Sequence, residues 1–292
     1  MDKLLILSGK GGTGKTTVAA SFIALSKAEA YADCDVDAPN LHLVTGTKGD
    51  AELADYQGLP RAFVNTELCI GCGKCEKSCR FGAINLQNGI AKADPYACEG
   101  CKVCTLECPV EAISMEPFII GELKLIKGEK TFSTAKLKTG GGATGKLVTE
   151  VKRRLFLNSK NAATAIIDGS PGIGCPVLAS MNGVSLVLVV AEPSMSGISD
   201  MKRVIETALR QHTPVCVCIN KWDTNPDKSR EIEEFCKANN VPFAGKIPFD
   251  PNVIKAVNSG SPVSELPTAA GIAMNELYNN TMNILKEKRI IK

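Results

Sequence analysis

Two cysteine runs with the same spacing constrain this chain more than any other feature. Residues 69–79 follow the pattern C-x2-C-x2-C-x3-C, and residues 98–108 repeat the same pattern. The similarity continues into the Ala-Ile pairs that begin at Ala83 and Ala112, which predicts a duplicated module. Cysteines clustered in this way indicate metal ligation in a reducing compartment rather than disulfide bonds.

This spacing is typical of bacterial ferredoxins with two 4Fe–4S clusters, in which the fourth Cys of each run ligates the other cluster. The predicted ligands of the first cluster are Cys69, Cys72, Cys75 and Cys108. The predicted ligands of the second cluster are Cys98, Cys101, Cys104 and Cys79. A zinc site needs only four Cys at paired spacing, so two equal runs favour iron–sulfur clusters. Arg80 stands after the first run where Pro109 follows the second, and a positive charge there is expected to raise a cluster potential.

Short apolar runs alternate with helical patterns on both sides of the Cys-rich segment. The strand-like runs are Lys3–Leu7, Ala30–Cys34, Ala163–Ile167, Val184–Ala191 and Val215–Ile219. They have the composition of strands buried on both faces, and helical patterns separate them. The alternation predicts an α/β fold with a doubly wound, mostly parallel sheet.

The Cys-rich segment interrupts this α/β pattern and is expected to form an inserted α+β ferredoxin domain. We expect domain parts at residues 1–59 and 119–292, with the insertion at 60–118. Residues 140–146 also read G-x-x-x-x-G-K, but Leu147 follows where a nucleotide loop has Ser or Thr. We interpret the glycines of residues 139–145 as a flexible connection into a helix.

A nucleotide-binding loop is predicted at residues 9–16, which fit G-x-x-x-x-G-K-[ST] between a strand and a helix. Backbone N–H groups of such a loop converge on phosphate oxygens, and the helix N-terminus adds its positive end. Lys15 is expected to contact the β- and γ-phosphates of ATP or ADP, and Thr16 to ligate Mg²⁺. The predicted contact residues of the loop are Gly11, Gly12, Thr13, Gly14, Lys15, Thr16 and Thr17.

Acidic residues follow two of the predicted strands. Residues 33–37 contain three Asp, and Asp168 ends an apolar strand before Gly169–Gly172. Carboxylates at this edge of a sheet lie beside bound phosphates. Asp168 is expected to act on Mg²⁺, and the loop after it to sense the γ-phosphate.

Two later segments are candidates for contact with the base. Asn220 follows a buried strand, and Pro248-Phe249-Asp250 follows the next apolar segment. We predict that Asn220 contacts the purine and that Pro248 and Asp250 border it. Either segment is also compatible with a turn that simply ends a strand.

The loop Lys10-Gly-Gly-Thr-Gly-Lys-Thr resembles the deviant loop of the MinD, ParA and nitrogenase iron-protein superfamily. The resemblance implies a slow ATPase that forms an ATP-dependent homodimer, in which Lys10 reaches the nucleotide of the partner copy. It also implies a water-orienting carboxylate in the acidic segment. Asp35 matches that position best, and Asp37 is the alternative. Cys175 lies just past the predicted phosphate sensor. Two interpretations of it are open: it binds a bridging metal between two copies, or it is an ordinary packing residue.

Fusion of a nucleotide switch with an electron carrier predicts ATP-gated electron transfer to an unidentified redox protein. The alternative is a cluster carrier of the Mrp type that delivers iron–sulfur units to apo-proteins. A positioning ATPase like MinD is disfavoured, because the basic end Leu285–Lys292 is too short for a membrane-binding helix.

Composition excludes other classes of protein. The longest apolar runs are of strand length, far short of the roughly 20 residues that span a bilayer. The N-terminal apolar run lacks the features of a signal peptide, so a cytoplasmic location without a membrane partner is expected. Basic runs with interleaved aromatics are absent, and we therefore expect no nucleic-acid partner.

Overall fold

The structure, a computed structural model, describes residues 1–138, 140, 142 and 144–290. It divides into two compact units. The larger, here called the α/β unit, comprises Met1–Leu53, Leu123–Lys136 and Thr144–Lys292. The smaller, here called the Cys-rich unit, comprises Ala54–Glu122 and Leu137–Ala143.

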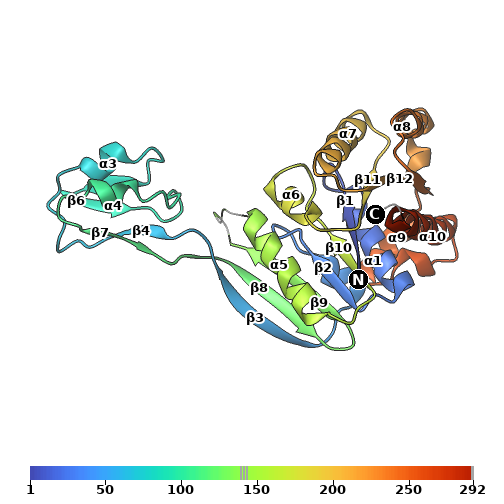
Figure 1. The fold of residues 1–292 in the computed structure, drawn as a ribbon, viewed down its shortest axis with the longest axis horizontal. Helices are drawn as coiled ribbons and strands as arrows, with labels where there is room; N and C mark the ends of the chain where they lie inside the picture. The colour runs from blue at the N-terminus through green and yellow to red at the C-terminus, as the bar shows by residue number, and fades with distance from the viewer. Residues whose placement is uncertain (139, 141, 143, 291–292) are drawn as a thin grey trace. The chain divides into compact units, whose positions relative to one another are not determined.

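A sheet with the strand order β13-β12-β11-β1-β10-β2-β9-β8-β3 organises the α/β unit (Figure 1). All the described pairings from β13 to β9 are parallel. The bounds are β1 Asp2–Leu7, β2 Ala30–Asp33, β3 Asp50–Gln57, β8 Ile119–Lys127, β9 Thr131–Leu137, β10 Thr164–Asp168, β11 Leu186–Ala191, β12 Val215–Asn220 and β13 Phe243–Ile247. The predicted α/β class with a mostly parallel sheet is confirmed.

Helices cover both faces of this sheet. Consecutive residues of the central strands, which point to opposite faces, are therefore all buried. Leu4 and Ile6 of β1 belong to a core with α1 and α10, and Leu5 and Leu7 are equally buried on the other face. Helices α5, α6 and α7 contact β2, β1 and β11. The helices are α1 Lys15–Ser26, α2 Leu41–Thr45, α5 Thr144–Asn158, α6 Cys175–Met181, α7 Met195–Arg210, α8 Pro226–Ala238, α9 Pro251–Asn258 and α10 Ala269–Ile290, with 3-10 turns η1 Trp222–Thr224 and η2 Val263–Glu265.

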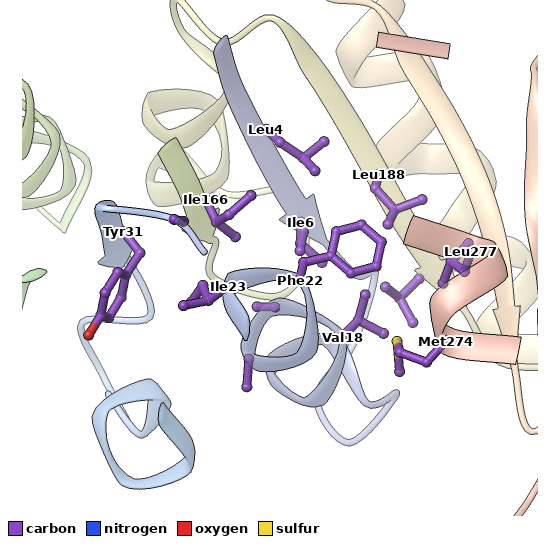
Figure 2. Close-up of a cluster of buried hydrophobic side chains, with 14 of the residues drawn as sticks. Leu4, Ile6, Val18, Phe22, Ile23, Tyr31, Ile166, Leu188, Met274 and Leu277 are labelled. Carbon is purple, nitrogen blue, oxygen red and sulfur yellow. The ribbon is translucent and has the colours of Figure 1, made fainter. Parts of the chain in front are cut away.

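Large apolar side chains fill the core between β1 and α1. Figure 2 shows Phe22 of α1 among Ile6, Leu188 and Met274. The ring of Phe22 also packs edge-on against Tyr278, with centroids 5.2 Å apart. This core holds the end of β1 and the start of α1 in place, and the predicted nucleotide loop connects them.

The Cys-rich unit has a repeated structure. Its elements are β4 Arg61–Val64, α3 Lys74–Ser78, β5 Ile84–Gln87, β6 Ile90–Ala93, α4 Val103–Glu107 and β7 Ile113–Glu116. Each element of the first half recurs in the second with the spacing of the two Cys runs, so that β4 corresponds to β6, α3 to α4 and β5 to β7. Strands β4 and β7 form one antiparallel pair, and β5 and β6 form the other. The duplication expected from the Cys runs is therefore also a structural one.

None of the helices in the described part of the chain combines the length and apolar character of a membrane-spanning segment.

Candidate functional site

The loop between β1 and α1 has the backbone that a phosphate-binding turn requires. Gly12 and Gly14 have φ angles of 80° and 91°, in the left-handed region that glycine adopts at low cost. Helix α1 begins directly after them at Lys15, so its free N–H groups face the loop. The Thr13 hydroxyl is buried without a hydrogen-bond partner among the described residues.

Three of the predicted phosphate and Mg²⁺ residues converge in the structure. The Lys15 ammonium forms an ion pair with Asp168, which is fully buried at the end of β10. The Thr16 hydroxyl donates to the other carboxylate oxygen of Asp168 at 2.6 Å. Parallel pairing sets this geometry, because Ile6 of β1 lies opposite Asp168 in register.

A fourth residue, Asp33, joins this group, and the sequence reasoning gave it no separate role. It ends β2 opposite Asp168, and its carboxylate accepts hydrogen bonds from the amides of Asp35, Asn40 and Leu41 at 2.8–3.0 Å. Burial and the nearby Asp168 charge raise the pKa of Asp33 to about 7. A signal was available in the sequence, because Asp33 ends one buried strand as Asp168 ends another.

The two candidates for the water-orienting carboxylate lie in different surroundings. Asp35 is half-buried, and burial raises its pKa, while the charge of Lys15 acts in the opposite direction. Asp37 is exposed to solvent. Asp35 is thus the one in the electric field of Lys15 and Asp168.

Lys10 points to a partner within its own chain. Its ammonium lies 3.0 Å from the carboxylate of Glu192 and within 3.3 Å of the hydroxyls of Ser194 and Ser196. Lys221 reaches the same carboxylate at 3.5 Å. Burial opposes ionisation of Glu192, but Lys10 and Lys221 together hold its pKa below the ordinary value. Sequence reasoning missed Glu192, which lies far from Lys10 along the chain.

A cavity of about 240 Å³ opens beside the loop. Gly12, Gly14 and Thr17 of the loop and α1 line it, together with Asn220 at the end of β12 and Lys221 after it. The Asn220 amide donates to the Thr13 carbonyl at 2.8 Å, which ties β12 to the loop.

Side chains of α9, rather than the residues before it, complete this cavity. Val253, Ile254 and Val257 form its apolar wall. Pro248 and Asp250, which the sequence placed beside the base, are not among the lining residues. Asp250 instead caps α9, where its carboxylate accepts from the Asn252 amide at 2.8 Å.

The eight cysteines of the two runs line two cavities. The first is lined by Cys69, Cys72, Cys75 and Cys108. The second is lined by Cys79, Cys98, Cys101 and Cys104. The structure thus brings three Cys of one run together with the fourth Cys of the other.

Backbone amides point at the sulfur atoms of these cysteines. The amides of Ala91 and Ala112 donate to Cys69 and Cys108 at 3.4 and 3.2 Å. Cys98 and Cys79 each accept one amide hydrogen bond at 3.4 Å. Such bonds stabilise thiolate ligands and tune iron–sulfur potentials.

This donor set fits iron–sulfur clusters. At each site four sulfur donors lie around a cavity, and backbone amides donate to two of the four. Burial raises the thiol pKa of Cys75 and Cys104, and a bound cation would favour their thiolate forms.

The remaining predictions concern single cysteines and the second glycine-rich stretch. Cys216, Cys218 and Cys236 are buried in the α/β unit, as expected of core residues. Cys175 is exposed at the start of α6. Of the predicted flexible connection, residues 139, 141 and 143 lie outside the described residues, and helix α5 begins at Thr144.

Three comparisons relate this chain to known proteins. The CbiA profile, the CobQ/CobB/MinD/ParA nucleotide binding domain, matches residues 4–263. An uncharacterized protein of Methanocaldococcus jannaschii is 32% identical over 288 residues, covering 94% of this chain and 95% of the relative. The septum site-determining protein MinD from Pyrococcus horikoshii, complexed with Mg-ADP, superposes with a TM-score of 0.58 at 19% identity and covers 98% of each chain, so it shares the fold.

A further relative matches only part of the chain. A ferredoxin of Pyrobaculum islandicum is 31% identical over 107 residues, which is 36% of this chain and 86% of the ferredoxin. The similarity suggests an iron–sulfur region within a nucleotide-binding protein.

Proposed function

The chain belongs to the CobQ/CobB/MinD/ParA family of nucleotide-binding proteins, and from this premise we propose an ATP-dependent electron-transfer function. ATP hydrolysis in the α/β unit controls electron transfer through two 4Fe–4S clusters in the Cys-rich unit to a redox protein. The proposed domain parts are residues 1–59, 60–118 and 119–292.

The proposed nucleotide site assigns a role to each converging group. Lys15 binds the β- and γ-phosphates, and Thr16 with Asp168 holds Mg²⁺, because the ammonium and the hydroxyl already share that carboxylate. Asp35 orients the attacking water, since it is the half-buried candidate beside Lys15. Asn220 and the apolar wall from α9 bind the base.

Lys10 acts across a homodimer in this proposal. In the single chain its ammonium is held by Glu192, Ser194 and Ser196. Lys10 must leave these partners to stabilise phosphate charge in a second copy, as an arginine finger does. Dimer formation therefore exchanges one ion pair for another, which suits a reversible switch.

One observation carries the proposed coupling between nucleotide and clusters. The Lys152 ammonium of α5 donates to the carbonyls of Ala179, Ser180 and Asn182 at 3.0, 2.7 and 2.6 Å, and so caps the end of α6. Burial lowers the pKa of Lys152 to about 8, so at neutral pH a charged group is bound to the negative end of the helix.

The two helices joined by this cap follow two different functional segments along the chain. Helix α6 begins at Cys175, just after the predicted phosphate sensor Gly169–Gly172. Helix α5 begins at Thr144, directly after the chain leaves the Cys-rich unit. At their starts the two helices are in close contact, since a Cβ on Gly145 would lie 3.1 Å from the Cys175 carbonyl oxygen. In this proposal, movement of the sensor is passed through α6 and α5 to the segment by which the chain leaves the Cys-rich unit.

Stopped-flow oxidation of the reduced protein by a viologen dye tests this proposal, with and without MgATP. We expect MgATP to change the oxidation rate in the wild type and in Arg153→Met, which alters an exposed residue of the same helix. Lys152→Met is expected to bind ATP but to lose the response. Equal rates with and without MgATP in the wild type would contradict the proposal.

A second candidate function is delivery of clusters to apo-proteins. Cys72 and Cys101 are exposed, whereas Cys75 and Cys104 are buried, so each site has one ligand that an acceptor can reach. Loss of iron to an apo-ferredoxin, measured after separating the two proteins, distinguishes delivery from electron transfer, in which iron stays at about eight per chain.

A further inference from the structure

We infer that the buried guanidinium of Arg61 makes the two cluster sites unequal, so that an electron rests on the site of Cys79, Cys98, Cys101 and Cys104. This inference rests on the cluster content of the proposed function and is independent of ATP gating. Below, the Cys69 site is the one lined by Cys69, Cys72, Cys75 and Cys108, and the Cys98 site is the other.

The backbone contacts of the two sites are equivalent under the internal repeat. The amide of Ala62 donates to Cys98, and the amide of Ala91, its counterpart in the repeat, donates to Cys69, both at 3.4 Å. Ala83 and Ala112 form the second such pair, with Cys79 and Cys108. Each site therefore receives the same number of amide hydrogen bonds at the same positions.

Close backbone packing also repeats. A Cβ on Gly100 would lie 2.6 Å from the Pro60 carbonyl oxygen, and one on Gly71 would lie 2.1 Å from the Gly89 carbonyl oxygen. Pro60 and Gly89 are again counterparts in the repeat, and each precedes the strand whose amide reaches a sulfur. Only glycine permits this approach, so β4 and β6 are fixed against their Cys runs in the same way.

Arg61 breaks this equivalence. It lies between Pro60 and Ala62, where the other half of the repeat has Ile90. The Arg61 side chain is 6% exposed, and its Nε and Nη1 atoms have no hydrogen-bond partner within the described residues. Its guanidinium lies over the Phe118 ring at 5.8 Å.

The charge of Arg61 is not neutralised by an ion pair among the described residues. Glu116 lies opposite Arg61 in the β4–β7 register, but it is exposed and accepts a hydrogen bond from Ser114 at 3.4 Å instead. Burial of an unpaired cation has a large desolvation free energy unless a nearby negative group offsets it.

The residues on either side of Arg61 both contact the second Cys run: the Pro60 carbonyl packs against Gly100, and the Ala62 amide donates to Cys98. The backbone of Arg61 therefore adjoins the Cys98 site, whose reduced form would supply the negative charge.

Burial makes Arg61 more effective than the exposed charges of the unit. Charges in solvent are screened, whereas a buried charge acts through a lower effective dielectric. Arg80, which the sequence singled out, is exposed, and so are Lys102 and Glu99, which line the Cys98 site with opposite charges. Arg61 therefore raises the reduction potential of the Cys98 site above that of the Cys69 site.

One electron would move in the step that follows from this inequality. A one-electron donor of low potential would supply it, the donor would be oxidised by one electron, and the Cys98 site would hold the electron in preference to the Cys69 site. No bond forms or breaks and no proton moves in this transfer.

An EPR-monitored redox titration of the anaerobic full chain, without nucleotide, tests the inference. In the wild type we expect two separate one-electron waves. In Arg61→Met we expect the midpoint potential of the higher wave to fall toward that of the lower wave by at least about 59 mV. This shift corresponds to a tenfold change in the distribution of one electron between the two sites. Cys101→Ser assigns the waves, because it alters the EPR signal of its own site.

Three further variants keep the test decisive. Arg61→Lys retains the charge and is expected to preserve the separation, and Arg80→Gln is the exposed control with little effect. Ile90→Arg places a cation in the equivalent position of the other half and is expected to raise the lower wave. Unchanged waves in both Arg61→Met and Ile90→Arg would overturn the inference. If Arg61→Met assembles poorly, an unchanged lower wave in Ile90→Arg would still overturn it. Loss of clusters from the wild type would instead refute the proposed function.

Discussion

The core of the α/β unit is built from large apolar side chains, whereas the small core of the Cys-rich unit contains predicted cluster ligands. Phe22, Tyr31 and Leu188 belong to the first core. The second has nine buried residues, and three of them are Cys75, Cys98 and Cys104. Small units with little apolar surface to bury need metals or disulfides for stability. The comparison predicts that burial stabilises the α/β unit and that ligation stabilises the Cys-rich unit.

Replacing one buried predicted ligand should have the largest effect, and it should affect the Cys-rich unit alone. In Cys104→Ser we expect iron to fall from about eight to about four per chain. Amides of the Cys-rich unit should lose protection from hydrogen exchange, because ligation energy is also folding energy. Amides of the α/β unit should stay protected.

The matched control for this substitution is Cys236→Ser, which alters a buried Cys of α8 far from both runs in sequence. Its iron content should equal that of the wild type. Equal iron loss in both variants would mean that the Cys-rich unit depends on general stability rather than on ligation.

A substitution in the nucleotide loop should have the converse effect. Lys15→Met removes the ammonium that is proposed to bind the β- and γ-phosphates. Loss of one charged partner of such a contact costs at least about 2 kcal/mol, so ATP should bind at least about 30-fold more weakly by calorimetry. Iron content should not change.

The exposed Lys237 of α8 supplies the control. Lys237→Met should bind ATP like the wild type. Iron loss in Lys15→Met would show that the stability of the Cys-rich unit depends on the nucleotide site, contrary to the comparison.

The third expected effect is a pH dependence confined to the α/β unit. Burial and Asp168 raise the pKa of Asp33 from 3.8 to about 7. Between these values the folded chain keeps a proton that the unfolded chain has released. The free energy of unfolding through this group should therefore fall as pH rises from 3.8 to about 7 and level off above it.

Urea unfolding followed by the fluorescence of Trp222, the single Trp, measures this effect. The slope should be lost in nucleotide-free Asp33→Asn and retained in Asp37→Asn, which changes an exposed carboxylate. A slope of the same size in both variants would assign the pH dependence to another group.

Local sequence patterns predicted much of this molecule. Buried strands such as Val184–Ala191 and the helix after Lys15 follow from apolar runs and glycine placement, and the structure has β11 and α1 there. The Cys runs predicted a duplicated module, and the secondary structure repeats with the same spacing. Such features depend on neighbours in the chain, so spacing alone reveals them.

Prediction was weaker where a site depends on distant segments. Pro248 and Asp250 were expected at the base, but α9 supplies the cavity wall through Val253 and Ile254. Glu192 received no role, because its contact with Lys10 depends on the ends of β1 and β11 meeting at one sheet edge.

The sequence by itself determined the chemistry that this chain can carry: a phosphate loop, an acidic strand end and two sets of sulfur ligands. Their identity and spacing are local properties. Only the tertiary structure decided which charges are buried. Arg80 looked important beside a ligand but is exposed, whereas Arg61 is enclosed without an ion-pair partner in the described chain. Burial arises from strand pairing and packing between distant segments, and it sets the strength of a charge.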